Sequence, residues 1–173
     1  LAKSNPTGLE WVIAHVVYFN QFAGWSPFVD GLLAKIDYKA LYFHYLSLAK
    51  GGMSVMQTPT NFTYKKVFYS IRGLLSAELA AKQQMPALKI TELFQQITPN
   101  DPLRQWGEDY LEIKQQQREK ALLSELEQQA VTRLLTNKIA DLTAHEPNKG
   151  PHAVALQRYL TDYSFQLKQH YYG

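Results

Sequence analysis

The sequence predicts an all-α fold, a bundle of about six to seven helices that forms a single domain over residues 1–173. Apolar residues recur at three- and four-residue spacings along most of the chain, and no segment keeps the two-residue alternation of a half-buried strand. The chain has 173 residues, 46% of them hydrophobic, which is enough for one domain with its own core.

The first two helices are predicted from their starts. Asn5-Pro6 is a typical beginning, because asparagine caps a helix and proline suits its first turn. This helix is expected to run to about Tyr18. Ser26-Pro27 repeats the signal and predicts a short helix that ends near Lys35.

The middle of the chain predicts two longer helices. Asp37 can cap the first, whose apolar face carries Leu41, Tyr45 and Leu48, and Gly51-Gly52 is expected to end it. The segment 58–61, Thr-Pro-Thr-Asn, then opens a helix that includes residues 65–81 and must end before Pro86.

The remaining residues predict a short helix and two long ones. The short helix covers 91–97, and the sequence Pro-Asn-Asp-Pro at 99–102 then breaks and restarts the chain. From Leu103 a helical pattern continues, with residues 112–120 as a polar, solvated helical bridge between two apolar groups; a hinge or a partner-binding arm is the other interpretation. A last helix follows Pro151.

The helix that starts near residue 65 carries an unusual stripe. At 100° per residue, Lys65, Tyr69, Arg72 and Ser76 fall within about 60° of one another. Apolar side chains take the opposite face: Val67, Phe68, Ile71, Leu74 and Leu75. The pattern predicts a helix with one face in the core and the other offering fixed cations and a phenol.

Three blocks of the chain carry a resemblance to a known family. Lys3–Trp11, His44–Lys50 and Lys65–Leu75 stand in the order found in the C-terminal helical part of a predicted nucleotidyltransferase family of the DNA polymerase β superfamily, one branch of which is linked with RNA repair. The resemblance covers about residues 1–95. Val67 stands where the family has an aromatic residue, and Gly73 where it has proline.

The resemblance implies that this chain is the C-terminal part of an α/β nucleotidyltransferase. Such enzymes resemble two-metal phosphoryl-transfer catalysts, in which an Asp-x-Asp pair and a third carboxylate hold Mg²⁺ against a nucleoside triphosphate. The chain begins Leu-Ala-Lys and contains no Gly-Ser turn followed by Asp-x-Asp. We therefore expect Mg²⁺ and the nucleoside triphosphate to bind the full-length protein and not this segment alone, and we expect an N-terminal catalytic domain as partner.

The stripe supplies the candidate nucleotide- and phosphate-binding residues. Lys65, Lys66 and Arg72 can hold phosphate oxygens, and Tyr69 can stack on a base or ribose, although cations on a helix face are commonly only solvated. No catalytic residue is assigned.

Three further residues are candidates for the wall of the cleft. They are Asn5, which capping also explains, His44, which lies among aromatic residues, and Lys138, from a weaker echo of the family over residues 134–151. The resemblance leaves the acceptor open between RNA and protein.

Composition excludes several classes of site. With no cysteine, disulfides, thiolate metal sites and cysteine nucleophiles are ruled out, and a cytoplasmic location is expected. The net charge of +3 is too mild to indicate nucleic-acid binding on its own. The histidines lack metal-helix spacing, so no metal site is expected, and no apolar run predicts a membrane span.

Two other functions remain to be weighed. A helical ribonuclease of the toxin type would show arginine followed by histidine, and this chain offers only Lys39 with His44. A non-catalytic interaction or structural bundle needs only the amphipathic helices. The coding sequence upstream of Leu1 distinguishes the latter from an enzyme, because only the enzyme requires Gly-Ser and Asp-x-Asp there.

Overall fold

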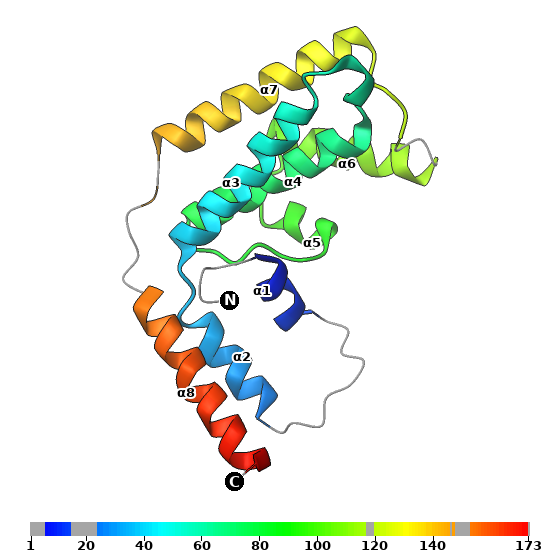
Figure 1. Cartoon of the computed structure of the whole chain (residues 1–173). Coiled ribbons are helices and arrows are strands. Elements are labelled where there is room, and N and C mark those ends of the chain that lie inside the picture. Colours follow the sequence, from blue (N-terminus) through cyan, green and yellow to red (C-terminus); the bar gives the residue numbers. More distant parts are fainter. Residues whose placement is uncertain (1–5, 15–23, 117–119, 146, 148–152, 173) are drawn as a thin grey trace. The chain divides into compact units, whose positions relative to one another are not determined.

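The computed structural model describes residues 6–14, 24–116, 120–145, 147 and 153–172, and over these residues the predicted all-α class is confirmed (Figure 1). The described elements are α1 (Pro6–Val12), α2 (Trp25–Leu33), α3 (Tyr38–Val55), the 3₁₀ turn η1 (Pro59–Asn61), α4 (Tyr64–Ala81), α5 (Ile90–Gln95), α6 (Pro102–Gln115), α7 (Glu125–Ala144) and α8 (Ala153–Tyr172). None of these helices is long and apolar enough to cross a bilayer.

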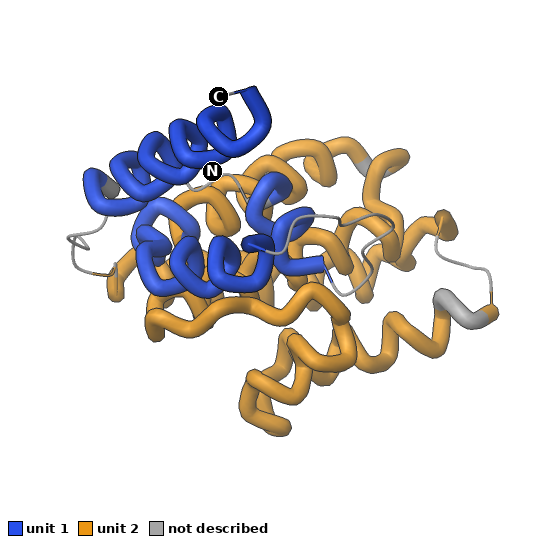
Figure 2. The backbone as a smooth tube through the Cα atoms, turned by 90° about the horizontal axis from the view of Figure 1, so that it is seen from below, with its two compact units in different colours: residues 1–41, 148–173 blue, residues 42–147 orange. Residues whose placement is uncertain are grey.

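The contacts divide the chain into two compact units (Figure 2). One unit comprises residues 1–41 and 148–173, and the other comprises residues 42–147. That all 173 residues form one domain stays a prediction.

The first unit is held by aromatic contacts between α2 and α8. The Phe28 ring stacks on Tyr163 at 4.2 Å and on Tyr159 at 6.0 Å between centroids. The Tyr159 hydroxyl donates to the Phe28 carbonyl at 3.0 Å, and the Tyr163 hydroxyl donates to the Gly24 carbonyl at 3.2 Å. Gly31 faces the Tyr159 hydroxyl, where a larger residue would collide with it. These contacts bury the Phe28 ring and give each tyrosine hydroxyl a hydrogen-bond acceptor.

The second unit is built around α4. Its apolar residues, including Val67, Ile71, Leu74 and Leu75, are fully buried. Thr63 caps the helix by accepting from the Lys66 backbone N–H at 3.4 Å, so the cap lies later than the predicted opening at 58–61, which forms the 3₁₀ turn instead. The predicted helix over 65–81 is confirmed.

The helix α3 passes through Gly51-Gly52 and ends at Val55, so the prediction that these glycines end it was wrong. Asp37 does cap α3, by accepting from two backbone N–H groups at 3.1 Å. Glycine at position 52 serves packing, because a Cβ there would collide with the Ser70 hydroxyl of α4. Position 51 faces open space.

These adjacent glycines give opposite predictions. Gly51→Ala should stabilise the protein by about 0.5 to 1 kcal/mol, because alanine improves helix propensity and meets no atom within 4 Å. Gly52→Ala should destabilise it by about 0.5 to 1 kcal/mol, because the Ser70 hydroxyl must turn away from the new Cβ and give up its hydrogen bond to the Lys66 carbonyl, a loss that exceeds the gain in helix propensity. Urea denaturation of both variants measures the difference; equal effects would mean that α3 and α4 do not pack as described.

The chain between α6 and α7 is not one continuous helix, because residues 116 and 120 are turns, which corrects the prediction of a solvated helical bridge over residues 112–120. The helix α6 ends at Gln115. Further on, the backbone of Tyr64 donates to Ala121 at 3.2 Å and that of Leu123 donates to Phe62 at 3.0 Å. Ser124 and Glu127 then form a capping box that starts α7. Residues 117–119 lie outside the described part.

Candidate functional site

The predicted stripe on α4 is shorter than the sequence indicates. Tyr69 is 57% exposed, and Lys65 and Arg72 are half-buried on the same side of the helix. Ser76, the predicted fourth member, is only 2% exposed and belongs to the core. The accessible stripe therefore occupies the first half of α4 and ends at Arg72.

The three cations of the stripe region differ in their surroundings. Lys66 Nζ donates to Asn61 Oδ1 at 2.7 Å, which ties it to η1. Arg72 Nη2 donates to the Leu88 carbonyl at 3.3 Å, so the guanidinium is positioned by the segment that links α4 to α5. Lys65 makes no ion pair or side-chain hydrogen bond within the described part of the chain. Of the three, Lys65 is the most available to a ligand, and Arg72 is the best oriented.

A second helix borders this stripe. Tyr45 and Ala49 of α3 contact Gly73, and Gly52 faces Ser70, so α3 runs antiparallel to α4. Gly73 allows the close approach, since a Cβ there would lie 3.2 Å from the Tyr45 carbonyl oxygen.

The exposed side of α3 extends the surface. At 100° per residue, His44, Leu48, Gly51 and Val55 lie within about 60° of one another. Leu48 is 56% exposed and Val55 is 49% exposed, although the sequence placed Leu48 on the core-facing side. Tyr42 and Met53, on the other side of α3, face α7. We call the surface formed by Lys65, Tyr69, Arg72, His44, Leu48 and Val55 the α3–α4 face. It lies on the side of the two helices away from α7.

Aromatic packing holds α4 against α6. The ring of Phe68 stacks on Tyr110 at 4.2 Å, and that of Tyr64 stacks on Trp106 at 6.0 Å. The Tyr64 hydroxyl donates to Glu127 Oε1 at 2.6 Å, which links α4 to the start of α7. These contacts hold the first two turns of α4, which carry Lys65 and Tyr69, against α6 and the start of α7.

The structure places Lys138 away from the α3–α4 face. Its Nζ lies 2.5 Å from Glu78 Oε2 and 3.1 Å from Asp101 Oδ2, and all three side chains are mostly buried. Glu78 lies about 140° around α4 from Lys65. Asp101 also caps α6 by accepting from the Leu103 backbone N–H at 2.8 Å. Lys138 thus joins three helices, an arrangement that sequence spacing could not indicate.

The pKa values of this cluster favour its charged form. Burial by itself raises the pKa of Glu78, but hydrogen bonds and charges of Lys138 and Lys82 outweigh it and bring the pKa below 4.5. Burial likewise lowers the pKa of Lys138, and the two carboxylates more than reverse this, so its pKa lies above 10.5.

A pH dependence of stability follows from these directions. Because the pKa of Glu78 is lowered by folding, its contribution is present near neutral pH and is lost as the pH falls through its folded-state pKa, below 4.5. The contribution of Lys138 is lost as the pH rises above 10.5. We expect melting temperatures of the wild type to fall more steeply below pH 4.5 than those of Lys138→Met. Parallel curves for the two proteins would contradict the cluster's role.

The other cleft candidates are placed only in part. Asn5 lies outside the described residues. His44 is half-buried on the α3–α4 face and meets the Tyr45 ring edge-on, with centroids 6.4 Å apart. The described residues contain no group of three metal-ligating side chains. The cations Lys65 and Arg72 of the α3–α4 face can bind an anion beside the exposed ring of Tyr69.

The comparisons with known proteins identify the family of this chain. The model of the RlaP family, described as the RNA repair pathway DNA polymerase beta family, matches residues 1–162. The chain is also 26% identical to "Uncharacterized protein YcgL" of Bacillus subtilis (strain 168) over 113 residues, which are 65% of this chain and 44% of that protein. No solved structure matches. The chain belongs to the RNA repair pathway DNA polymerase beta family.

Proposed function

We propose that this chain is the helical C-terminal part of an α/β nucleotidyltransferase, and that its α3–α4 face forms one wall of the nucleotide cleft. The family match over residues 1–162 carries the proposal. The aligned region covers less than half of the curated relative, which leaves room in such a protein for a further part. The α3–α4 face also supports the proposal, because Lys65 and Arg72 can bind phosphate oxygens and the exposed ring of Tyr69 can stack on a base.

In the proposed reaction, an acceptor hydroxyl attacks the α-phosphorus of a nucleoside triphosphate. A new P–O bond forms to the acceptor oxygen, whose proton passes to water; the bond to the β-phosphate oxygen breaks, and pyrophosphate leaves with the electron pair. Lys65 and Arg72 stabilise the charge that moves onto pyrophosphate, and Tyr69 stacks on the base or ribose.

The ligands for Mg²⁺ are proposed to lie in the preceding part of the protein. Mg²⁺ requires several carboxylate oxygens together with substrate phosphates, and the described residues bring no such group together. The acceptor is proposed to be RNA or a protein, and the location cytoplasmic.

A transfer assay tests this division of labour. The full-length protein and this chain alone are incubated with Mg²⁺, each of the four α-³²P-labelled ribonucleoside triphosphates, and RNA or protein acceptors. We expect label on an acceptor with the full-length protein and none with the chain alone, because the part of the chain that the structure describes brings no set of carboxylates together for Mg²⁺. Transfer by the chain alone would refute the proposed division, and absence of transfer by the full-length protein would refute the enzymatic role.

A binding role without catalysis is the second candidate. It is favoured by Leu48, Val55 and Tyr69, three large side chains exposed on one side of α3 and α4. If the coding sequence before Leu1 carries no Gly-Ser and Asp-x-Asp elements, this candidate replaces the first.

A further inference from the structure

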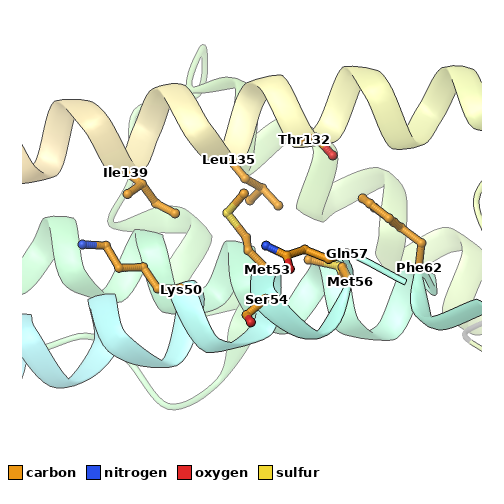
Figure 3. Close-up of a pocket in the computed structure, with 9 residues that line it drawn as sticks. All are labelled: Lys50, Met53, Ser54, Met56, Gln57, Phe62, Thr132, Leu135 and Ile139. Atoms are coloured by element: carbon orange, nitrogen blue, oxygen red, sulfur yellow. The ribbon is translucent and has the colours of Figure 1, made fainter. Parts of the chain in front are cut away.

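A groove lies between α3 and α7, on the side of α3 opposite the α3–α4 face. Its deeper part is a cavity of about 300 Å³ with an apolar lining of Met53, Met56, Phe62, Leu135 and Ile139. Figure 3 shows Met53 rising toward Leu135, with Lys50 at one end of the cavity and Phe62 and Thr132 at the other.

The groove continues into a second, more polar space. This space, about 570 Å³, shares Met56, Gln57, Phe62 and Thr132 with the first. Its other lining residues are amides, hydroxyls and one cation: Gln128, Gln129, Arg133, Thr136 and Asn137. Along α7 the groove extends from residue 128 to residue 139, about 16 Å at 1.5 Å per residue.

The charged residues that line the groove indicate which class of ligand it can bind. Lys50 and Arg133 are its ionised lining residues, and no carboxylate lines either space in the described part of the chain. An anion with an apolar body is complementary to this arrangement. The amide of Gln57 and the hydroxyl of Thr132 stand at the junction of the two spaces, where they offer hydrogen bonds that the polar edge of a ring can use and an acyl chain cannot.

We propose that the α3–α7 groove binds a nucleoside monophosphate. The base occupies the apolar cavity, where the thioethers of Met53 and Met56 suit an aromatic ring and Gln57 meets a polar edge of the base. The phosphate lies in the polar space against Arg133, whose guanidinium matches its oxygens. This site is separate from the α3–α4 face and does not depend on the proposed transfer reaction.

Binding of AMP to this chain, measured by isothermal titration calorimetry, tests the proposal; adenosine, inorganic phosphate and laurate serve as comparison ligands. We expect AMP to bind more tightly than adenosine or phosphate, and laurate not to compete. Arg133→Ala should weaken AMP about tenfold and leave adenosine unchanged, because it removes a charge-assisted hydrogen bond.

Two tryptophan variants locate the site. Thr132→Trp fills the junction of the two spaces and should abolish AMP binding, whereas Ala130→Trp, on the opposite side of α7, should leave it intact. Melting temperatures show whether both variants fold, and Arg133→Ala, at an exposed position, tests the site if Thr132→Trp does not. No AMP binding, equal binding of phosphate alone, preference for laurate, or unchanged AMP affinity in Arg133→Ala would each overturn the proposal.

Discussion

Arg72→Ala in the full-length protein is expected to lower kcat by about 30- to 1,000-fold, roughly 2 to 4 kcal/mol of transition-state stabilisation. The guanidinium is held by the Leu88 carbonyl at 3.3 Å, so it is oriented before the substrate arrives. Loss of that hydrogen bond should cost the fold only about 0.5 to 1.5 kcal/mol. Steady-state kinetics and thermal melting of the same variant separate the two effects.

Three comparisons sharpen this test. Lys65→Ala should lower kcat in the same direction but less, because lysine acts as a point charge. Arg72→Lys should recover part of the loss, since it restores the charge without the forked geometry. Arg158→Ala removes an exposed arginine of α8 and should change neither quantity. If Arg72→Ala lowers the melting temperature and leaves kcat unchanged, Arg72 is structural and the phosphate-binding role is wrong.

Lys138→Ala is expected to destabilise the protein by roughly 2 to 3 kcal/mol, because it leaves Glu78 and Asp101 mostly buried without their shared cation. For a chain of this size the melting temperature should fall by about 4 to 12 °C. Lys82→Ala is the matched control. Lys82 pairs with the same Glu78 but is 55% exposed, so its loss should cost about 0 to 1 kcal/mol.

A double variant separates the effect of charge from that of packing. Lys138→Met combined with Glu78→Gln removes the buried charge of Glu78, and we expect it to regain part of the stability that Lys138→Met alone loses. Guanidinium denaturation of the single and double variants measures the coupling. Equal losses for Lys82→Ala and Lys138→Ala would show that burial does not distinguish the two ion pairs.

Local signals in the sequence predicted most helix boundaries, because caps and prolines act within one turn. Asp37 caps α3, Pro102 restarts the chain at α6, and the helix over 65–81 forms as predicted. The first helix, predicted to run to about Tyr18, ends at Val12. The failure at the glycine pair has a tertiary cause. Gly51-Gly52 reads as a stop, yet Gly52 is small because Ser70 packs on it, and a contact across two helices leaves no local pattern.

The candidate site was predictable only as far as one helix reaches. Periodicity groups Lys65, Tyr69 and Arg72, but it cannot show that Ser76 is buried or that Leu88 holds the guanidinium. The exposed residues of α3 join the site because of the antiparallel contact at Gly73. Lys138 meets Glu78 and Asp101, 60 and 37 residues away, so its structural role required the fold.

Photo-crosslinking of a nucleotide to the full-length protein tests the central claim most directly. An azido-substituted nucleoside triphosphate is bound in the presence of Mg²⁺, irradiated, and the labelled peptide identified by mass spectrometry. If the α3–α4 face forms the wall of the nucleotide cleft, the label will lie on the peptide that contains Lys65, Tyr69 and Arg72, and an excess of unlabelled triphosphate will prevent it. A label confined to other peptides, in a protein that still transfers nucleotide, would contradict the account.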